Sequence, residues 1–116
     1  MGYKYNQPYI LENGIATECP RSKPGNVRPD FYHSTLNHLV EVKNYNITTA
    51  SSRSNLVNTI IRQYQERIKV FPEGLRYEVQ IDVRGQNYTE SILQEIKQNI
   101  LNKSNNAIDV KFIENE

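Results

Sequence analysis

The chain has 116 residues, 37% of them hydrophobic, which predicts one domain with one modest core. Its formal net charge is +1, so no global field attracts nucleic acid, and any surface that binds nucleic acid has to be small and local. The single cysteine, Cys19, excludes an internal disulfide framework and a cysteine-rich zinc site, and no apolar run approaches the roughly 18 residues of a membrane span.

Residues 1–24 predict an irregular or short helical lead-in. Between residues 3 and 17 the apolar side chains show no sustained period, and Pro8 and Gly14 interrupt the stretch. Residues 18–26 contain two prolines and a glycine, which is typical of a loop.

Residues 27–32 and 39–45 predict two strands joined by a polar turn, so that they pair as a hairpin. Pro29 has no N–H to donate, which places the first strand at an edge or at a bulge. The Leu-Val and Val of the second strand indicate burial near the centre of the sheet. His33 and His38 flank the turn and are expected to be solvated rather than to bind zinc or act as general bases.

Residues 55–71 predict the longest helix. Its apolar side chains recur every three or four positions and form one stripe. The stripe consists of Val57, Ile61, Tyr64, Ile68 and Phe71. Ser52 or Ser54 is the expected N-cap, and Pro72 ends the helix.

The last third of the chain predicts a strand at 75–84, a helix at 89–102 and an edge strand at 107–113. The first of these alternates apolar and polar residues, and Thr89 is the expected N-cap of the helix. The resulting order, β-β-α-β-α-β, predicts an α/β fold with a mixed central sheet of about four strands flanked by helices, in two or three layers.

Asp30, Glu41 and Lys43 are the candidate functional residues of the predicted hairpin. Glu41 and Lys43 are two apart on one strand, so their side chains share a face, and the hairpin brings Asp30 alongside. Two carboxylates, with the backbone carbonyl of Val42, supply the oxygen ligands that Mg²⁺ prefers, and a lysine can orient the attacking water or hold a phosphate. The alternative is a solvated strand face that carries an ordinary ion pair.

Residues 28–30 (Arg-Pro-Asp), ten intervening residues and residues 41–45 (Glu-Val-Lys-Asn-Tyr) resemble the PD-(D/E)XK nuclease superfamily, which has the restriction-endonuclease-like fold. With the stretch at 81–86, the chain is more narrowly similar to C-terminal nuclease domains of bacterial polymorphic toxins, including contact-dependent growth-inhibition toxins. The resemblance covers about residues 25–113. It implies that residues 1–116 are a single nuclease domain, such as the C-terminal toxin domain of a longer protein.

The resemblance implies that Asp30 and Glu41 bind a divalent metal together with the Val42 carbonyl, and that Lys43 is the catalytic lysine. Mg²⁺ is the expected ion, with Mn²⁺ or Zn²⁺ as alternatives. Relatives commonly add an acidic residue from a helix before the first strand. Glu12 and Glu18 are the candidates for that position here, and neither is placed on a predicted helix.

Four further side chains extend the expected site. In many relatives a Gln on the helix after the Glu-x-Lys strand supports the active site, and Gln63 fits this role, with Gln65 as the alternative. Arg67 lies four residues after Gln63 and shares its helix face. Arg28, Arg67 and Arg84 are expected to bind nucleic acid, because guanidinium groups pair well with phosphates.

The expected function is therefore that of a metal-dependent endonuclease, a DNase toxin domain used in competition between bacteria. Such a toxin would be delivered from a bacterial cell as part of a larger protein, act in the cytoplasm of the target cell and be neutralised by a cognate immunity protein. A tRNA-cleaving toxin of the same fold, a housekeeping or mobile-element nuclease, and a non-catalytic α/β binding module are the alternatives.

Overall fold

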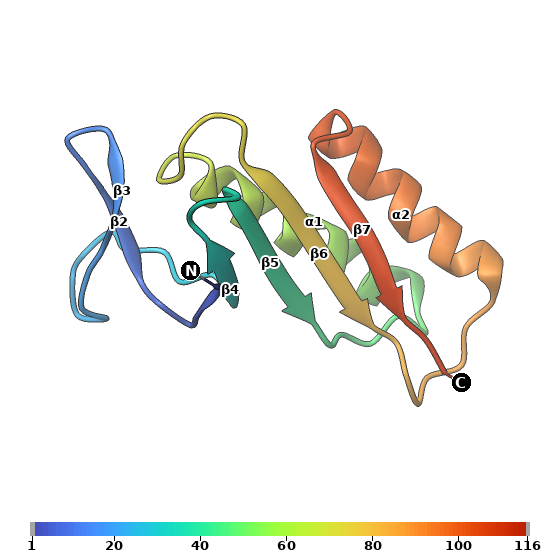
Figure 1. Cartoon of the computed structure of the whole chain (residues 1–116). Helices are drawn as coiled ribbons and strands as arrows, with labels where there is room; N and C mark the ends of the chain where they lie inside the picture. Colours follow the sequence, from blue (N-terminus) through green and yellow to red (C-terminus); the bar gives the residue numbers. More distant parts are fainter. Residues whose placement is uncertain (1, 116) are drawn as a thin grey trace.

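The computed structural model describes residues 2–115 and contains a five-stranded mixed sheet, a separate hairpin and two helices (Figure 1). The elements are β1 (Lys4–Tyr5), β2 (Tyr9–Glu12), β3 (Ile15–Glu18), β4 (Phe31–His33), β5 (His38–Lys43), α1 (Ala50–Arg67), β6 (Arg76–Asp82), α2 (Glu90–Ser104) and β7 (Ile108–Ile113). The sheet order is β1-β4-β5-β6-β7, antiparallel from β1 to β5 and parallel from β5 to β7. This confirms the expected α/β class with a mixed sheet.

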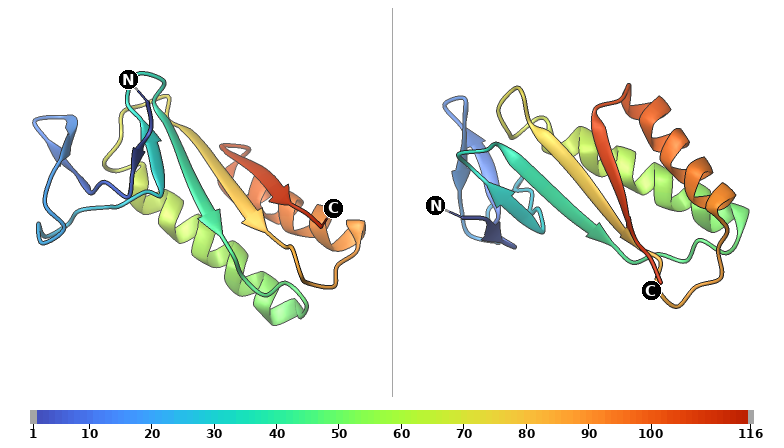
Figure 2. Two further views of the ribbon diagram at one scale, coloured as in Figure 1. Left: turned by 60° about the horizontal axis from the view of Figure 1, so that its bottom comes forward. Right: turned by 45° about the vertical axis from the view of Figure 1, so that its right-hand side comes forward.

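Both helices cover the same face of the sheet, so the fold has two layers (Figure 2). The alternation in β6 explains the arrangement, because Tyr77, Val79 and Ile81 all point to the helix side and are fully buried. They pack in one hydrophobic core with buried residues of the helices. The helix residues of this core are Leu56, Val57, Ile60, Leu93, Ile96 and Ile100.

Helix α1 starts and ends earlier than the apolar period indicates. Its N-cap is Thr49, whose Oγ1 accepts the Ser52 N–H at 3.1 Å, rather than Ser52 or Ser54. At the other end the helix stops at Arg67, so Ile68 is 46% exposed instead of lying in the buried stripe. Phe71 is buried all the same, because the chain turns back towards the core after the helix.

The expected loop is present at residues 19–26, but the expectation of an irregular or short helical lead-in is wrong for residues 4–18, most of which lie in strands. This segment forms β1, which pairs with β4, and the hairpin of β2 and β3, which stands beyond the edge of the sheet (Figure 1). Asn13 and Gly14 both adopt positive φ, 52° and 76°, as a tight two-residue hairpin turn requires. Tyr9 anchors the hairpin, since its buried ring packs edge-on against Phe71.

The expected hairpin of β4 and β5 is confirmed, with Phe31 opposite Val40 and His33 opposite His38. Its first strand is shorter than expected, because the chain before Phe31 contributes only an isolated bridge between Val27 and Tyr9. Pro29 lies in the interruption, which agrees with its inability to extend the ladder.

The predictions for the last third of the chain are confirmed. Strand β6 and helix α2 start within two residues of the expected positions, and β7 is an edge strand. Thr89 is the N-cap of α2, and its Oγ1 accepts the Ile92 N–H at 3.2 Å. No helix among residues 2–115 is long and apolar enough to cross a membrane.

The sheet face without helices holds a buried polar cluster around His38, which contradicts the expectation that this histidine is solvated. His38 is only 7% exposed, and the Tyr3 hydroxyl lies 2.5 Å from its Nδ1. Its Nε2 lies 3.3 Å from Glu78 Oε1, within ion-pair distance but without hydrogen-bond geometry. Gln80 donates to the other Glu78 oxygen, and Lys111 lies 3.4 Å from Oε1.

Candidate active site

Strand β5 presents Glu41 and Lys43 on the face covered by helices. Glu41 is 2% exposed and Lys43 is half-buried, so both charges lie where an apolar side chain would be expected. Asp30 stands directly before β4, and its Oδ2 accepts the Val42 N–H at 2.7 Å. The structure therefore brings together the three candidates that the hairpin was expected to unite.

Asp30 replaces a strand partner at the end of the β4–β5 ladder. The ladder stops at the pair of Phe31 and Val40, so Val42, the next residue facing that side, bonds to the Asp30 carboxylate instead. The Asn6 N–H donates to the Asp30 carbonyl at 2.9 Å and fixes its backbone. Because the N–H and C=O of a strand residue point to the same side, the Val42 carbonyl faces the same edge.

This edge opens into a hollow of about 320 Å³. Its lining consists of Tyr5, Asn6, Asp30, Phe31 and Val42. The Tyr5 and Phe31 rings contact each other there, with centroids 5.2 Å apart. A ligand in this hollow would meet the carboxylate of Asp30 and a pair of aromatic rings.

Helix α1 supplies the partners of the two buried charges. The Arg67 Nε–H donates to Glu41 Oε1 at 2.9 Å, and Lys43 Nζ donates to Gln63 Oε1. Gln63 and Arg67 are four residues apart and so share the helix face that crosses β5. Gln65 is exposed, which leaves Gln63 as the glutamine of this site.

Burial raises the pKa of Glu41 above its ordinary value. The attraction and hydrogen bond of Arg67 oppose this increase, as does Lys43, whereas the neighbouring Asp30 adds to it. The pKa of Lys43 moves the other way, because burial lowers it and only the attraction of Glu41 and Asp30 opposes the decrease. Burial thus disfavours the charged forms of both groups, a pattern that is common at functional sites.

The expected divalent metal needs several oxygen ligands close together. Among residues 2–115, no three His, Cys, Asp or Glu side chains gather where they can hold a metal ion. Asp30, Glu41 and the Val42 carbonyl nevertheless supply the kind of ligands that Mg²⁺ takes, since this ion usually binds one or two carboxylates and keeps several waters. The set offers only oxygen ligands, which favours Mg²⁺ or Mn²⁺ over Zn²⁺.

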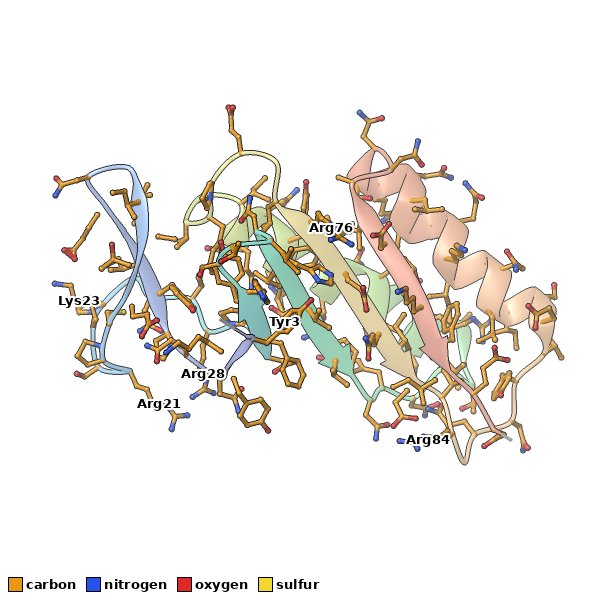
Figure 3. The ribbon with its side chains drawn as sticks, in the orientation of Figure 1. Tyr3, Arg21, Lys23, Arg28, Arg76 and Arg84 are labelled. Carbon is orange, nitrogen blue, oxygen red and sulfur yellow. The ribbon has the colours of Figure 1, made fainter. Side chains whose placement is uncertain are left out.

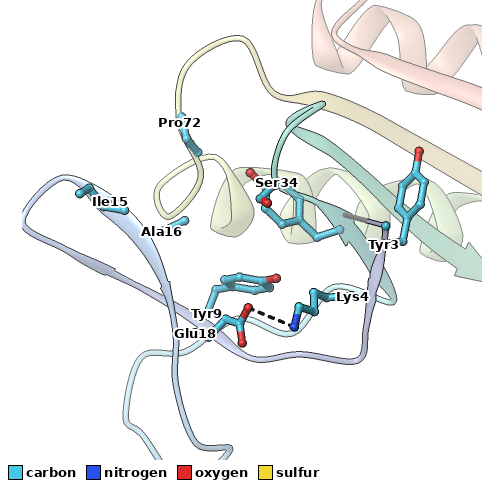
Figure 4. Close-up of a pocket in the computed structure, with 10 residues that line it drawn as sticks. Tyr3, Lys4, Tyr9, Ile15, Ala16, Glu18, Ser34 and Pro72 are labelled. Atoms are coloured by element: carbon cyan, nitrogen blue, oxygen red, sulfur yellow. Dashed lines mark ion pairs between the residues drawn. The ribbon is translucent and has the colours of Figure 1, made fainter.

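The two candidates for an additional acidic ligand lie elsewhere. Glu12 is exposed at the end of β2. Glu18 lies between the hairpin and the sheet, where its carboxylate is 3.8 Å from Lys4 Nζ and faces Tyr9 (Figure 4). Neither residue therefore extends the pair of Asp30 and Glu41.

The three arginines expected to bind nucleic acid separate into two places. Arg28 and Arg67 line one hollow beside the site. Arg84 follows β6, away from Arg28 in Figure 3, and its guanidinium is 2.8 Å from the Asp82 carboxylate. The pairing of Arg67 with Glu41 was not predicted, because nothing local in the sequence shows where α1 crosses β5.

The sequence matches no protein-family model, and a search of curated proteins found no match. Among solved structures, a chain of the "CdiA-CT/CdiI toxin and immunity complex from Yersinia pseudotuberculosis" is similar, with a TM-score of 0.47 and 16% sequence identity. The comparison covers 84% of this chain and 87% of that chain. At this level of similarity, a functional assignment depends on the side chains described above.

Proposed function

We propose that this protein is a metal-dependent endonuclease that hydrolyses phosphodiester bonds, with DNA as its substrate. The observation that carries the proposal is the convergence of Asp30, Glu41 and Lys43 at the end of β5, with Gln63 bonded to the lysine. Two carboxylates and a half-buried lysine placed together are costly to fold, so their presence needs an explanation beyond stability.

Asp30 and Glu41, with the Val42 carbonyl, would hold the metal ion. When bound, such an ion lowers the pKa of water and offsets the charge that develops on phosphorus. Lys43 is held by Gln63 and can bind a phosphoryl oxygen with its fixed charge. Because burial lowers its pKa, its ammonium is also a better proton donor than that of a solvated lysine.

A non-catalytic binding module is the second candidate, and the close pairing of Glu41 with Arg67 favours it. In that case the buried pair would only fix how α1 crosses β5. The two candidates predict different effects when each charge is removed. In a nuclease the rate of hydrolysis falls, whereas in a binding module only the stability changes, because the protein has no hydrolytic activity.

The test is cleavage of plasmid DNA and of total tRNA by the purified protein with Mg²⁺, Mn²⁺ or Zn²⁺. Asp30→Asn, Glu41→Gln and Lys43→Met keep the side-chain sizes and remove the charges. Each is expected to lower the cleavage rate at least about 100-fold, and EDTA is expected to abolish cleavage. Asp82→Asn is the matched control, because Asp82 is a half-buried strand carboxylate outside the site and its loss should leave cleavage unchanged.

A folded wild-type protein that cuts neither substrate with any of the three metals would refute the proposal. Cleavage at the wild-type rate by a variant that carries all three substitutions would also refute it. Cleavage of tRNA but not of plasmid would keep the nuclease and correct its substrate. Circular dichroism of every variant separates a loss of chemistry from a loss of folding.

The role as a delivered toxin with a cognate immunity protein also belongs to this proposal, and the motif resemblance is its support. Its test is the growth of bacteria that express the chain in the cytoplasm. Growth arrest that depends on Glu41 and is relieved by the product of the adjacent gene would support a toxin. Normal growth with a catalytically active chain would refute the toxin role and leave the nuclease intact.

A further inference from the structure

A hollow of about 420 Å³ lies beside the candidate active site and is lined by three arginines. Its lining consists of Arg21, Asn26, Val27, Arg28 and Arg67. Arg67 joins the hollow to the site, because this residue lines the hollow and its guanidinium donates to Glu41. Arg21 belongs to the loop that follows β3, and Arg28 lies near it (Figure 3).

Two of the three guanidinium groups have no neutralising partner among residues 2–115. Arg67 is paired with Glu41, whereas neither Arg21 nor Arg28 forms an ion pair with any of residues 2–115. Like charges around one hollow repel each other, and an anion placed between them would relieve that repulsion. A phosphate suits this position, because guanidinium groups bind its oxygens in a planar, two-bond geometry.

The loop that carries Arg21 is held in place before any ligand arrives. The Asn26 side-chain amide donates to the Arg21 carbonyl at 3.0 Å and to the Lys23 carbonyl at 2.6 Å. The loop ends at Val27, whose backbone exchanges two hydrogen bonds with Tyr9, at 2.8 and 2.9 Å. A site ordered in this way loses less conformational entropy when it binds.

The chemistry of the lining also limits which part of a nucleic acid can bind. Within the described part of the chain, the hollow has no aromatic lining residue on which a base could stack, in contrast to the hollow at Asp30 with Tyr5 and Phe31. Contacts to phosphates fix the position of a nucleic acid but do not read its sequence. Binding through the arginine-lined hollow should therefore not depend on sequence.

We infer that the arginine-lined hollow holds a backbone phosphate of the nucleic acid next to the phosphate that is cleaved, with Arg21 and Arg28 as its phosphate-binding residues. The identity of the ligand as a polynucleotide rests on the proposed function. Because the net charge of the chain is only +1, its nucleic-acid-binding surface has to be small and local, and Arg21 and the loop of residues 20–26 belong to that surface.

The experiment measures binding without cleavage. Fluorescence anisotropy in EDTA records the affinity for two labelled 20-base-pair duplexes of unrelated sequence, over a range of salt concentrations. Arg21→Gln and Arg28→Gln should each weaken binding to both duplexes equally and reduce the slope of log K against log salt by about 0.9, the value for one lost phosphate contact. Arg76→Gln is the control, because Arg76 is an exposed arginine at the start of β6, remote from the hollow (Figure 3).

Several results would overturn the inference. They are an unchanged slope for Arg21→Gln, an equal effect of Arg76→Gln, a loss confined to one duplex, and no salt-dependent binding by the wild type. Full displacement of the duplex by millimolar inorganic phosphate would also overturn it, since the hollow would then be a site for the small anion. A protein that binds DNA through Arg21 but never cuts it would keep this inference and refute the nuclease.

Discussion

Replacing Arg67 with methionine would remove the partner of a carboxylate that cannot reach water. The side chain of Glu41 is 3% exposed and that of Arg67 is 14% exposed, so the carboxylate is buried and its partner is largely buried. Removing one partner of a buried pair leaves an uncompensated charge and costs about 3–5 kcal/mol. The free energy of unfolding of a domain of this size is only about 5–15 kcal/mol, so the Arg67→Met variant should fold but be much less stable than the wild type.

The same substitution should make stability depend on pH. Burial and Asp30 raise the pKa of Glu41, and Arg67 is the main group that lowers it. Without Arg67, the pKa of Glu41 in the folded state therefore rises further above its value in the unfolded state. At pH values between the unfolded and the folded pKa, Glu41 is protonated in the folded protein but ionised in the unfolded chain. The free energy of unfolding therefore falls as the pH rises through this range. The loss in Arg67→Met should be larger at pH 8 than at pH 5, and Glu41→Gln combined with Arg67→Met should recover part of it.

Urea denaturation followed by circular dichroism at both pH values measures these differences. Arg84→Met is the matched control, because the Arg84 side chain is 60% exposed and its pair with Asp82 should contribute about 1 kcal/mol or less. A loss below about 1 kcal/mol for Arg67→Met would refute the reasoning. So would a double variant that is no more stable than Arg67→Met alone, since the cost would then not come from the unpaired carboxylate.

Three further changes test the fold and the opposite face of the sheet. Thr89→Ala removes the N-cap of α2 and should cost about 1 kcal/mol in urea denaturation, whereas Thr89→Ser should cost much less. Gly14→Ala places a side chain at φ 76° and should destabilise the protein by about 1 kcal/mol. Amide hydrogen exchange should become faster in β2 and β3 first, and unchanged exchange would contradict the positive φ at this turn. Burial raises the pKa of Glu78, but its hydrogen bond from Gln80 and the attraction of Lys111 outweigh burial and lower it. Its contribution to stability is therefore lost as the pH falls through the folded value, and Glu78→Gln should flatten the acid side of the pH–stability curve; an unaltered curve would count against this role.

The sequence could predict those elements whose signals are local. The alternation of β6, the Thr89 cap and the polar turn between β4 and β5 each depend on a few neighbouring residues, and all three are present. The start of α1 is not predictable from the apolar period, because its first turn holds Ser51, Ser52 and Arg53 and the apolar stripe begins only at Val57. The hairpin of β2 and β3 had a usable signal, Asn13-Gly14, but the irregular pattern of the flanking residues obscured it.

The candidate site divides in the same way. The meeting of Asp30, Glu41 and Lys43 follows from strand alternation and one hairpin register, so it could be predicted. The pairing of Arg67 with Glu41 depends on the angle and depth at which α1 packs on the sheet. Packing of the whole core sets these quantities, and no short motif encodes them. The burial of His38 has the same origin, because Tyr3 and Glu78 come from distant parts of the chain.

A single guanidinium that serves two sites has a thermodynamic consequence. Arg67 donates to Glu41 and also lines the arginine-lined hollow, so an anion in the hollow competes with Glu41 for the same positive charge. An anion that draws Arg67 away leaves the carboxylate more available to a cation, and a cation at Glu41 in turn frees Arg67 for the anion. The affinities of the two ligands are then linked by one reciprocal coupling free energy, so each should bind more tightly in the presence of the other.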